Sequence, residues 1–110
     1  MRRGEIRWCT FKAPDKRRPV LLLTRDEVMH ALAEVIVVPV TRTIRGIATE
    51  VRLGADDGMQ TDCAANFDHI GLAHRAQIGA TIATLRPERW PEVRRALLVA
   101  CGFGAEPPRP

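Results

Sequence analysis

The uncharged apolar stretch at residues 35–40 (VIVVPV) is only six residues long, and no such stretch of the chain approaches twenty. A helix that crosses a bilayer needs about 20 mostly apolar residues, so the sequence excludes a membrane span. Most residues of the stretch are β-branched, which favours a strand. Pro39 lies inside it and implies an edge position or a bulge. The sequence therefore indicates a fold built from short strands.

The rest of the chain repeats this pattern of short segments between turn signals. Apolar alternation or a short apolar run predicts further strands at residues 4–11, 19–23, 49–53, 63–67 and 78–85. Loops are predicted at 12–18 and 54–58, and Gly71 and Gly79 are expected to be breaks or bulges. Thr24 and Glu27 have the spacing of a capping box, which predicts a short helix over residues 26–33.

The only long helical pattern lies at the end of the chain. Val93, Leu97, Leu98 and Cys101 recur at helical spacing, and Gly102 follows as a stop signal. Pro87 or Pro91 is expected in the first turn, where a missing N–H costs nothing. Together these segments predict a mostly β fold with one C-terminal α-helix, arranged as a small antiparallel barrel. We expect one domain over residues 1–104 and a flexible tail at 105–110.

Positive charge is concentrated near the N-terminus. Residues 1–18 hold seven cationic side chains against two acidic ones, and 15 of the 17 cations of the chain are arginine. The planar guanidinium suits bidentate contacts with phosphate, so a polyanionic partner is one hypothesis. An ordinary soluble surface is the other, because the formal net charge is only +4. No apolar segment follows the N-terminal arginines, which predicts a cytoplasmic protein without a secretory signal.

Metal sites, disulfides and familiar enzyme motifs are not expected. The three cysteines are far apart and odd in number, so we interpret them as small buried apolar residues. The three histidines are scattered, and the motifs of phosphate-binding loops, serine hydrolases and zinc proteases are absent from the sequence. The sequence therefore predicts neither a metal nor a cofactor.

Two cationic segments are candidate phosphate sites. In residues 16–19 (KRRP), Lys16, Arg17 and Arg18 precede an apolar strand, and Pro19 restricts Arg18 to an extended conformation. Residues 41–46 (TRTIRG) end another strand with two hydroxyls and two guanidiniums, a set that could cradle a phosphate. Both segments also have the composition of ordinary solvated loops, and the residues alone leave that alternative open.

The order and spacing of several motifs resemble those of the MazF/PemK family. The match runs over about residues 3–102 and includes R-G-E-I-x-W at 3–8, R-P-V-L-x-L at 18–23, V-V-P-V-T-R-T-x-R-G at 37–46, E-V-x-L at 50–53, D-G-M at 57–59, D-C-x-x-N-F-D-H-I at 62–70 and A-L-x-x-A at 96–100. The resemblance implies an SH3-like barrel and a homodimer. It also implies a sequence-selective endoribonuclease that cuts single-stranded RNA as the toxin of a type II toxin–antitoxin pair.

Carried over residue by residue, the resemblance makes Arg18 and Thr41 the catalytic pair at the scissile phosphate. Asp68 matches a further family position and is a candidate catalytic or RNA-orienting residue. Asn66 stands where some members have an arginine, and His69 where Gln or Asn is more common. RNA contacts are expected from five neighbouring residues: Lys16, Arg17, Arg42, Thr43 and Arg45.

The implied reaction needs no metal, because RNA supplies its own nucleophile, the 2′-hydroxyl. Arg18 and Thr41 would stabilise charge on the phosphorane oxygens. Arginine stays charged and is a poor proton shuttle, so the group that removes the 2′-proton is either Asp68 or water. The family's products are a 2′,3′-cyclic phosphate and a 5′-hydroxyl.

The expected protein partner is a cognate antitoxin whose acidic, flexible C-terminal segment covers the basic groove and folds on binding. Two other functions stay open: a CcdB-like DNA gyrase poison, which shares the barrel and the dimer, and a non-catalytic basic RNA-binding barrel. The presence of Arg18, Pro19 and Thr41 favours the nuclease over the poison, because a poison needs none of them.

Overall fold

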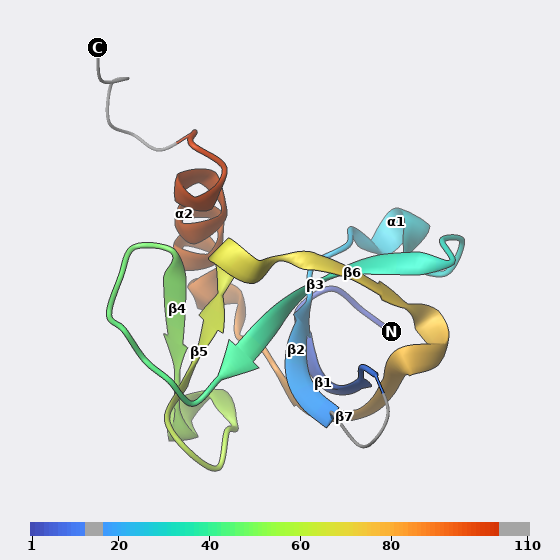
Figure 1. Cartoon of the computed structure of the whole chain (residues 1–110), viewed down its shortest axis with the longest axis horizontal. Coiled ribbons are helices and arrows are strands. Elements are labelled where there is room, and N and C mark those ends of the chain that lie inside the picture. The colour runs from blue at the N-terminus through green and yellow to red at the C-terminus, as the bar shows by residue number, and fades with distance from the viewer. Residues whose placement is uncertain (13–16, 104–110) are drawn as a thin grey trace.

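The computed structural model describes residues 1–12 and 17–103 as a curled sheet with one long helix packed against it (Figure 1). The strands are β1 (Glu5–Thr10), β2 (Arg17–Leu22), β3 (Glu34–Thr41), β4 (Glu50–Leu53), β5 (Cys63–Asn66), β6 (Gly71–His74) and β7 (Ile78–Thr84). The helices are α1 (Asp26–Met29) and α2 (Trp90–Ala100), with 3-10 turns η1 (Ala55–Asp57), η2 (Phe67–His69), η3 (Arg75–Gln77) and η4 (Pro87–Arg89). No helix in the described ranges is long and apolar enough to cross a membrane.

The central strand of the sheet is β3. The strand order is β4-β5-β3-β2-β1-β7, β6 also pairs with β3, and every pairing is antiparallel. This confirms the predicted mostly β fold with one C-terminal helix. The edge position considered for the strand with Pro39 is wrong. Pro39 lies opposite Val20 of β2, so it is inside the sheet. The pairing of β3 with β5 begins only at the next residue, so the proline, which has no N–H to donate, falls outside that ladder.

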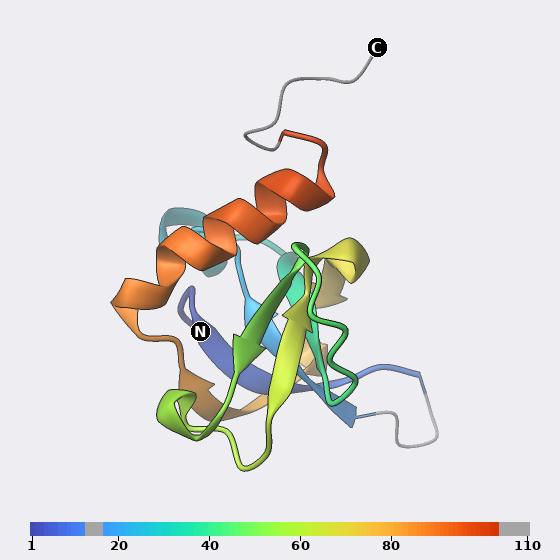
Figure 2. The ribbon, with the colours of Figure 1, turned by 90° about the vertical axis from the view of Figure 1, so that its left-hand side faces the viewer.

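Two apolar cores lie on the two faces of β2 and β3. Successive strand residues point to opposite faces, so Leu21 and Val38 enter one core while Val20 and Val37 enter the other. The first core also contains Phe67 and is closed by α2, which lies across β4 and β5 (Figure 2). The second fills the inside of the curled sheet. Splitting the sheet into two cores leaves the ends of β2 and β3 near Arg17 and Thr41 at the surface.

The long helix follows the sequence prediction closely. Pro91 lies in the first turn of α2, and Gly102 ends it with a φ of +82°, a left-handed conformation that glycine adopts without strain. Cys9 and Cys63 are buried free thiols as expected, but Cys101 is exposed at the end of α2, so the expectation for that cysteine is wrong. The predicted tail, residues 105–110, lies outside the described residues.

Two local predictions are corrected. The short helix α1 covers only Asp26–Met29, and no side chain caps it. Thr24 is buried, and its hydroxyl accepts the N–H of Ile36 at 2.7 Å, so it ties the chain to β3 and does not cap α1. The predicted break at Gly71 is also wrong, because Gly71 begins β6 and pairs with Val37.

Candidate functional site

The ends of β2 and β3 bring Arg18 and Thr41 to the same part of the surface. The last pair of the β2–β3 ladder is Val20 with Pro39. The same register continued by two residues sets Arg18 across from Thr41, on the same face of the sheet. Arg18 is exposed and Thr41 is half-buried. An exposed arginine and a half-buried threonine therefore stand at the adjoining ends of these two strands.

The hydroxyl of Thr41 is oriented by its own backbone. Its oxygen accepts the N–H of Thr43 at 3.1 Å, a local turn that fixes one lone pair. A hydroxyl has one hydrogen and a second lone pair beyond this contact, so Thr41 retains a donor for an external acceptor. Arg42, Thr43 and Arg45 follow on an exposed segment. The end of β3 therefore offers hydroxyl and guanidinium donors close together.

Glu50 shapes this exposed segment, and the sequence analysis did not identify its role. One carboxylate oxygen of Glu50 accepts the N–H groups of both Arg45 (2.9 Å) and Gly46 (3.0 Å). Gly46 has a φ of +68°, which a residue with a Cβ would adopt only with strain. The carboxylate and the glycine together set the path of residues 42–46. Only the position of Glu50 at a strand start was visible in the sequence.

Replacing Glu50 with alanine should loosen this segment. The variant loses the acceptor for two backbone N–H groups, so we expect the free energy of unfolding to fall by about 1–3 kcal/mol. Amide hydrogen exchange at Arg45 and Gly46 should become faster by the factor that corresponds to this loss of free energy. Glu88→Ala is the matched control, because the carboxylate of Glu88 is 65% exposed and its ion pair with Arg86 contributes little. Equal exchange rates in wild type and Glu50→Ala would contradict the assignment.

Asn66 is the last residue of β5, and Asp68 follows it in η2. Thr41 pairs with Ala64 near the start of β5. Asn66 is two residues further along that strand, which places its Cα about 7 Å from the Cα of Ala64. The amide oxygen of Asn66, which is buried, accepts the N–H of Asp68 at 3.0 Å. The carboxylate of Asp68 accepts the hydroxyl of Thr49 at 2.7 Å. Within one chain Thr41 lies near the start of β5, and Asn66 and Asp68 lie at its other end. The roles of Arg18, Thr41, Asp68 and Asn66 all stay predictions.

Arg17 occupies the first position of β2 and packs against an aromatic ring. Its guanidinium carbon lies 4.4 Å from the ring centroid of Trp8, a cation–π contact across β1 and β2. Lys16, the remaining cation of this segment, lies outside the described residues, as does most of the loop 12–17.

A hollow of about 520 Å³ adjoins Thr41. It is lined by Trp8, Arg17, Pro19, Val40, Thr41, Arg42, Gly58, Met59, Gln60, Thr61, Cys63, Thr81 and Ile82. Burial, and secondarily the charges of Asp57 and Asp62, raise the pKa of the Cys63 thiol. Its sulfur donates to the carbonyl of Leu53 at 3.8 Å. Cys63 is therefore a neutral part of the wall and not an activated nucleophile.

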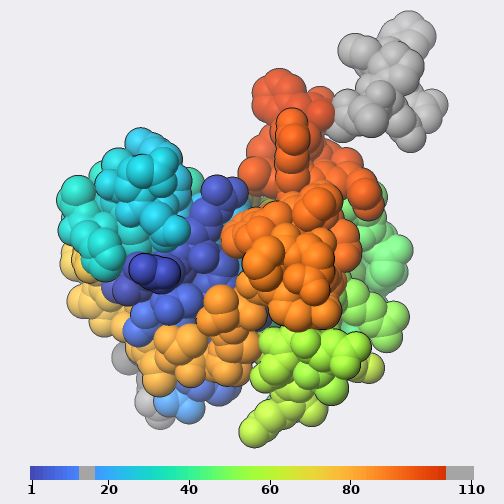
Figure 3. All heavy atoms as spheres, turned by 180° about the vertical axis from the view of Figure 1, so that it is seen from behind, coloured from blue at the N-terminus to red at the C-terminus, as the bar shows by residue number. Residues whose placement is uncertain are grey.

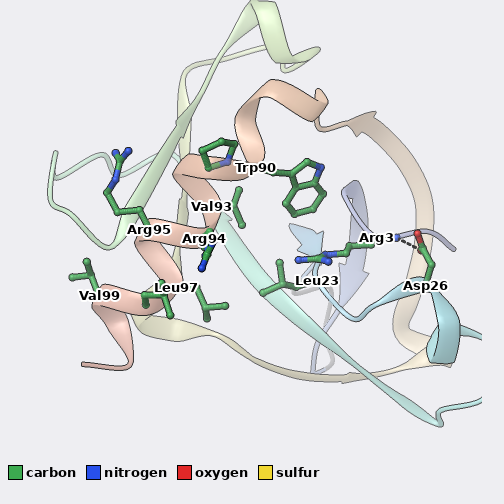
Figure 4. Close-up of a pocket in the computed structure, with 11 residues that line it drawn as sticks. Arg3, Leu23, Asp26, Trp90, Val93, Arg94, Arg95, Leu97 and Val99 are labelled. Atoms are coloured by element: carbon green, nitrogen blue, oxygen red, sulfur yellow. Dashed lines mark hydrogen bonds between the residues drawn. The ribbon is translucent and has the colours of Figure 1, made fainter. Parts of the chain in front are cut away.

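A separate groove of about 810 Å³ runs between α2 and the N-terminal region (Figures 3 and 4). Its wall is mostly apolar, and Arg3 lies over the ring of Trp90 at 4.7 Å while its N–H donates to Asp26 at 2.7 Å. None of the site residues predicted from the sequence lines this groove. Among the described residues, no group of three His, Cys, Asp or Glu side chains is arranged to hold a metal ion.

Comparison with known proteins identifies the family. The family model described as "PemK-like, MazF-like toxin of type II toxin-antitoxin system" matches residues 2–100. The "Probable endoribonuclease MazF2" of Mycobacterium tuberculosis is 39% identical over 103 residues, which are 93% of this chain and 99% of that protein.

Solved structures agree with this match. The Mycobacterium tuberculosis toxin MazF-mt6 superposes with a TM-score of 0.83 at 32% identity, over 90% of this chain and 97% of that one. A MazE–MazF crystal structure from Deinococcus radiodurans gives a TM-score of 0.76 at 25% identity, over 93% and 96% of the two chains. The chain therefore belongs to the PemK-like, MazF-like family of toxins of type II toxin–antitoxin systems.

Proposed function

We propose that this protein is a toxin that cuts single-stranded RNA as a sequence-selective endoribonuclease. The observation that supports the proposal is the β2–β3 register, which, continued by two residues beyond its last pair, would place Arg18 opposite Thr41 at an exposed end of the sheet. The names of similar mycobacterial proteins support it. One that matches 93% of this chain is named a probable endoribonuclease, and one that matches 76% is named an endoribonuclease.

The chemistry follows from what RNA supplies and what the site adds. The 2′-oxygen attacks the adjacent phosphorus, and the bond from phosphorus to the 5′-oxygen breaks. The products are a 2′,3′-cyclic phosphate and a 5′-hydroxyl. Negative charge grows on the non-bridging oxygens as the phosphorane forms, and donors placed at those oxygens lower the barrier. Arg18 donates from its guanidinium and Thr41 from its hydroxyl.

Proton transfer is the second requirement of the reaction. The 2′-hydroxyl must lose a proton, and the leaving 5′-oxygen must gain one. Arg18 stays charged and assists the leaving oxygen by hydrogen bonding, and water supplies the proton that this oxygen gains. Asp68 lies at the far end of β5 in the same chain, which favours water as the base within one protomer. A homodimer would offer Asp68 from the second protomer as the alternative.

The proposed partners follow from the charge of this surface. Arg17, Arg18, Arg42 and Arg45 are all exposed near the ends of β2 and β3, which suits the phosphates of a single strand. A cognate antitoxin with an acidic, flexible C-terminal segment would cover the same cations and exclude RNA. The protein is proposed to act as a homodimer in the cytoplasm, with no cofactor.

The direct test is to incubate the pure protein with a mixed-sequence single-stranded RNA in EDTA. We expect discrete fragments that end in a 2′,3′-cyclic phosphate, because the nucleophile belongs to the RNA and no metal is required. Fragment ends can be identified by mass spectrometry. RNA that stays intact under conditions where a known ribonuclease cuts it would overturn the proposal. Inhibition of gyrase in a supercoiling assay, with RNA intact, would replace it with a topoisomerase poison.

A further inference from the structure

We propose that the hollow beside Thr41 is a base pocket, which binds one nucleobase of the RNA next to the cleaved bond. This inference rests on the proposed function and deepens it by assigning a source of sequence selection. Four features of the hollow support it: its size and floor, a flat stacked pair at one wall, a polar rim, and its position beside the proposed catalytic pair.

The floor of the base pocket is apolar and of suitable size. The volume of about 520 Å³ lies within the range of small-ligand sites, which is about 300–1,000 Å³. Val40 and Cys63 are 5% and 3% exposed, and Met59 and Ile82 are partly buried beside them. An uncharged floor of this kind suits the flat face of a base and would not stabilise a phosphate or a carboxylate.

One wall of the base pocket carries a flat stacked pair. Trp8 and Arg17 lie 4.4 Å apart, measured from the guanidinium carbon to the ring centroid, and both line the pocket. Bases of single-stranded RNA stack on aromatic rings and on arginine guanidinium planes. The contact with Trp8 holds the exposed Arg17 before RNA arrives, so less side-chain freedom is lost on binding. A base at this wall would extend an existing stack.

The rim of the base pocket supplies hydrogen-bonding groups. Gln60 and Thr61 are exposed on the loop between η1 and β5. An amide offers both a donor and an acceptor, and so does a hydroxyl, which allows the rim to distinguish the edges of different bases. The loop begins at Gly58, whose φ is +84°, and a Cβ built there would lie 3.1 Å from the Cβ of Ala83. The backbone at Gly58 thus packs closely against β7, and this contact fixes where the rim begins.

Position decides between a base and a peptide as the occupant. Thr41 and Arg42 line the base pocket and also belong to the proposed phosphate site. A nucleotide whose phosphate contacts Thr41 has its base within reach of the stacked pair and the rim. An acidic peptide would meet arginines at the mouth but find no cation among the floor residues Val40, Met59, Cys63 and Ile82. The arrangement therefore favours a nucleobase.

The test compares base preference in wild type and two rim variants. Cut sites of the wild type on mixed-sequence RNA first define the preferred base at each position. In Gln60→Ala and Thr61→Val, the preference for one base over the others at one position adjacent to the cut should fall by about tenfold or more. The rim of the variant has lost the polar group that a wrong base would leave without a hydrogen bond. Preferences at the other positions should stay unchanged. Thr84→Val is the matched control, because Thr84 is exposed on the same strand as Thr81 and does not line the pocket.

An abasic substrate separates the base pocket from general effects. RNA that lacks only the base at that position should be cut by wild type about tenfold more slowly or worse, and the penalty should be smaller in the rim variants. Such non-additivity is the signature of two groups in contact. The abasic comparison on wild type alone still tests the pocket if a variant fails to fold.

Two results would overturn the base pocket while leaving the nuclease intact. One is an unchanged cut pattern and abasic penalty in both rim variants. The other is loss of binding to an acidic antitoxin peptide with base preference intact, which would assign the hollow to a protein partner. Failure of wild type to cut any RNA would instead overturn the proposed function itself.

Discussion

Replacement of Arg18 by alanine is expected to lower the rate of RNA cleavage by about a hundredfold or more, the effect of removing one donor to a developing oxyanion. The guanidinium is exposed at the end of β2, so its loss leaves no cavity and the fold should persist. Thr41→Ala should give a loss of similar size. Thr41→Ser should retain most activity, because serine supplies the same hydroxyl. Single-turnover rates on one mapped RNA measure these effects without a contribution from product release.

The matched control for the arginine is Arg25→Ala. Arg25 is also exposed, but it lies at the start of α1, beyond the other end of β2 from Arg18. The Arg25→Ala variant loses the same charge as Arg18→Ala, so it corrects for the general loss of RNA affinity that follows any lost cation. Cleavage by Arg18→Ala within a few fold of Arg25→Ala would show that Arg18 only attracts RNA. Near-normal rates in Arg18→Ala and Thr41→Ala together would refute the proposed site.

Local sequence patterns were enough to predict the long helix and most strands. The alternation in residues 4–11 and the apolar spacing before Gly102 each run the length of a single element, which is why β1 and α2 were predicted correctly. The strand β6 was missed, because four residues that begin with glycine carry too little alternation to outweigh a turn signal. The pairing of β6 with β3 decides its structure, and that contact is not local.

The functional residues also divide into those marked by a local pattern and those that depend on contacts between distant segments. Arg18 and Thr41 stand at strand ends, so motif order alone could nominate them, and β2 and β3 pair as neighbouring strands. Glu50 belongs to the E-V-x-L motif, which gave no hint of its role, and the rim residue Gln60 lies in none of the quoted motifs. Their importance depends on which backbone groups and which cavity the folded chain places beside them. A side chain that acts by holding another segment is visible only once the segments are assembled.

Asp57 is the clearest example of such a residue, and its replacement should have the largest effect on stability. The sequence analysis predicted only a loop at residues 54–58. In the fold, Asp57 is 6% exposed and accepts the N–H of Gly54 at 3.0 Å. Its other oxygen accepts from Arg89, which lies 32 residues later in the chain, and from Arg86. The carboxylate therefore ties η1, and the rim loop that follows it, to the start of α2.

Asp57→Asn should lower the free energy of unfolding at neutral pH by about 2–4 kcal/mol, because the guanidinium of Arg89 is left partly buried beside a neutral amide. Such a loss corresponds to a decrease in Tm of about 10 °C or more for a domain of this size. Asp56→Asn is the matched control, since Asp56 is the exposed neighbour in the same 3-10 turn. Urea unfolding at the same protein concentration for each variant measures the difference and holds the concentration dependence of any dimer constant.

The pH dependence of this difference identifies the charge as its cause. Burial by itself raises the pKa of Asp57, but the hydrogen bond from Gly54 and the contacts with Arg89 and Arg86 outweigh it and hold that pKa below its ordinary value. A carboxyl with a lowered folded pKa stabilises the fold above the unfolded pKa of about 4, and this stabilisation is lost as the pH falls through the folded value. The gap between wild type and Asp57→Asn should therefore be full at pH 7 and shrink below about pH 4. A gap that stays constant down to pH 2 would mean that the amide disturbs packing and that the ion pair contributes little.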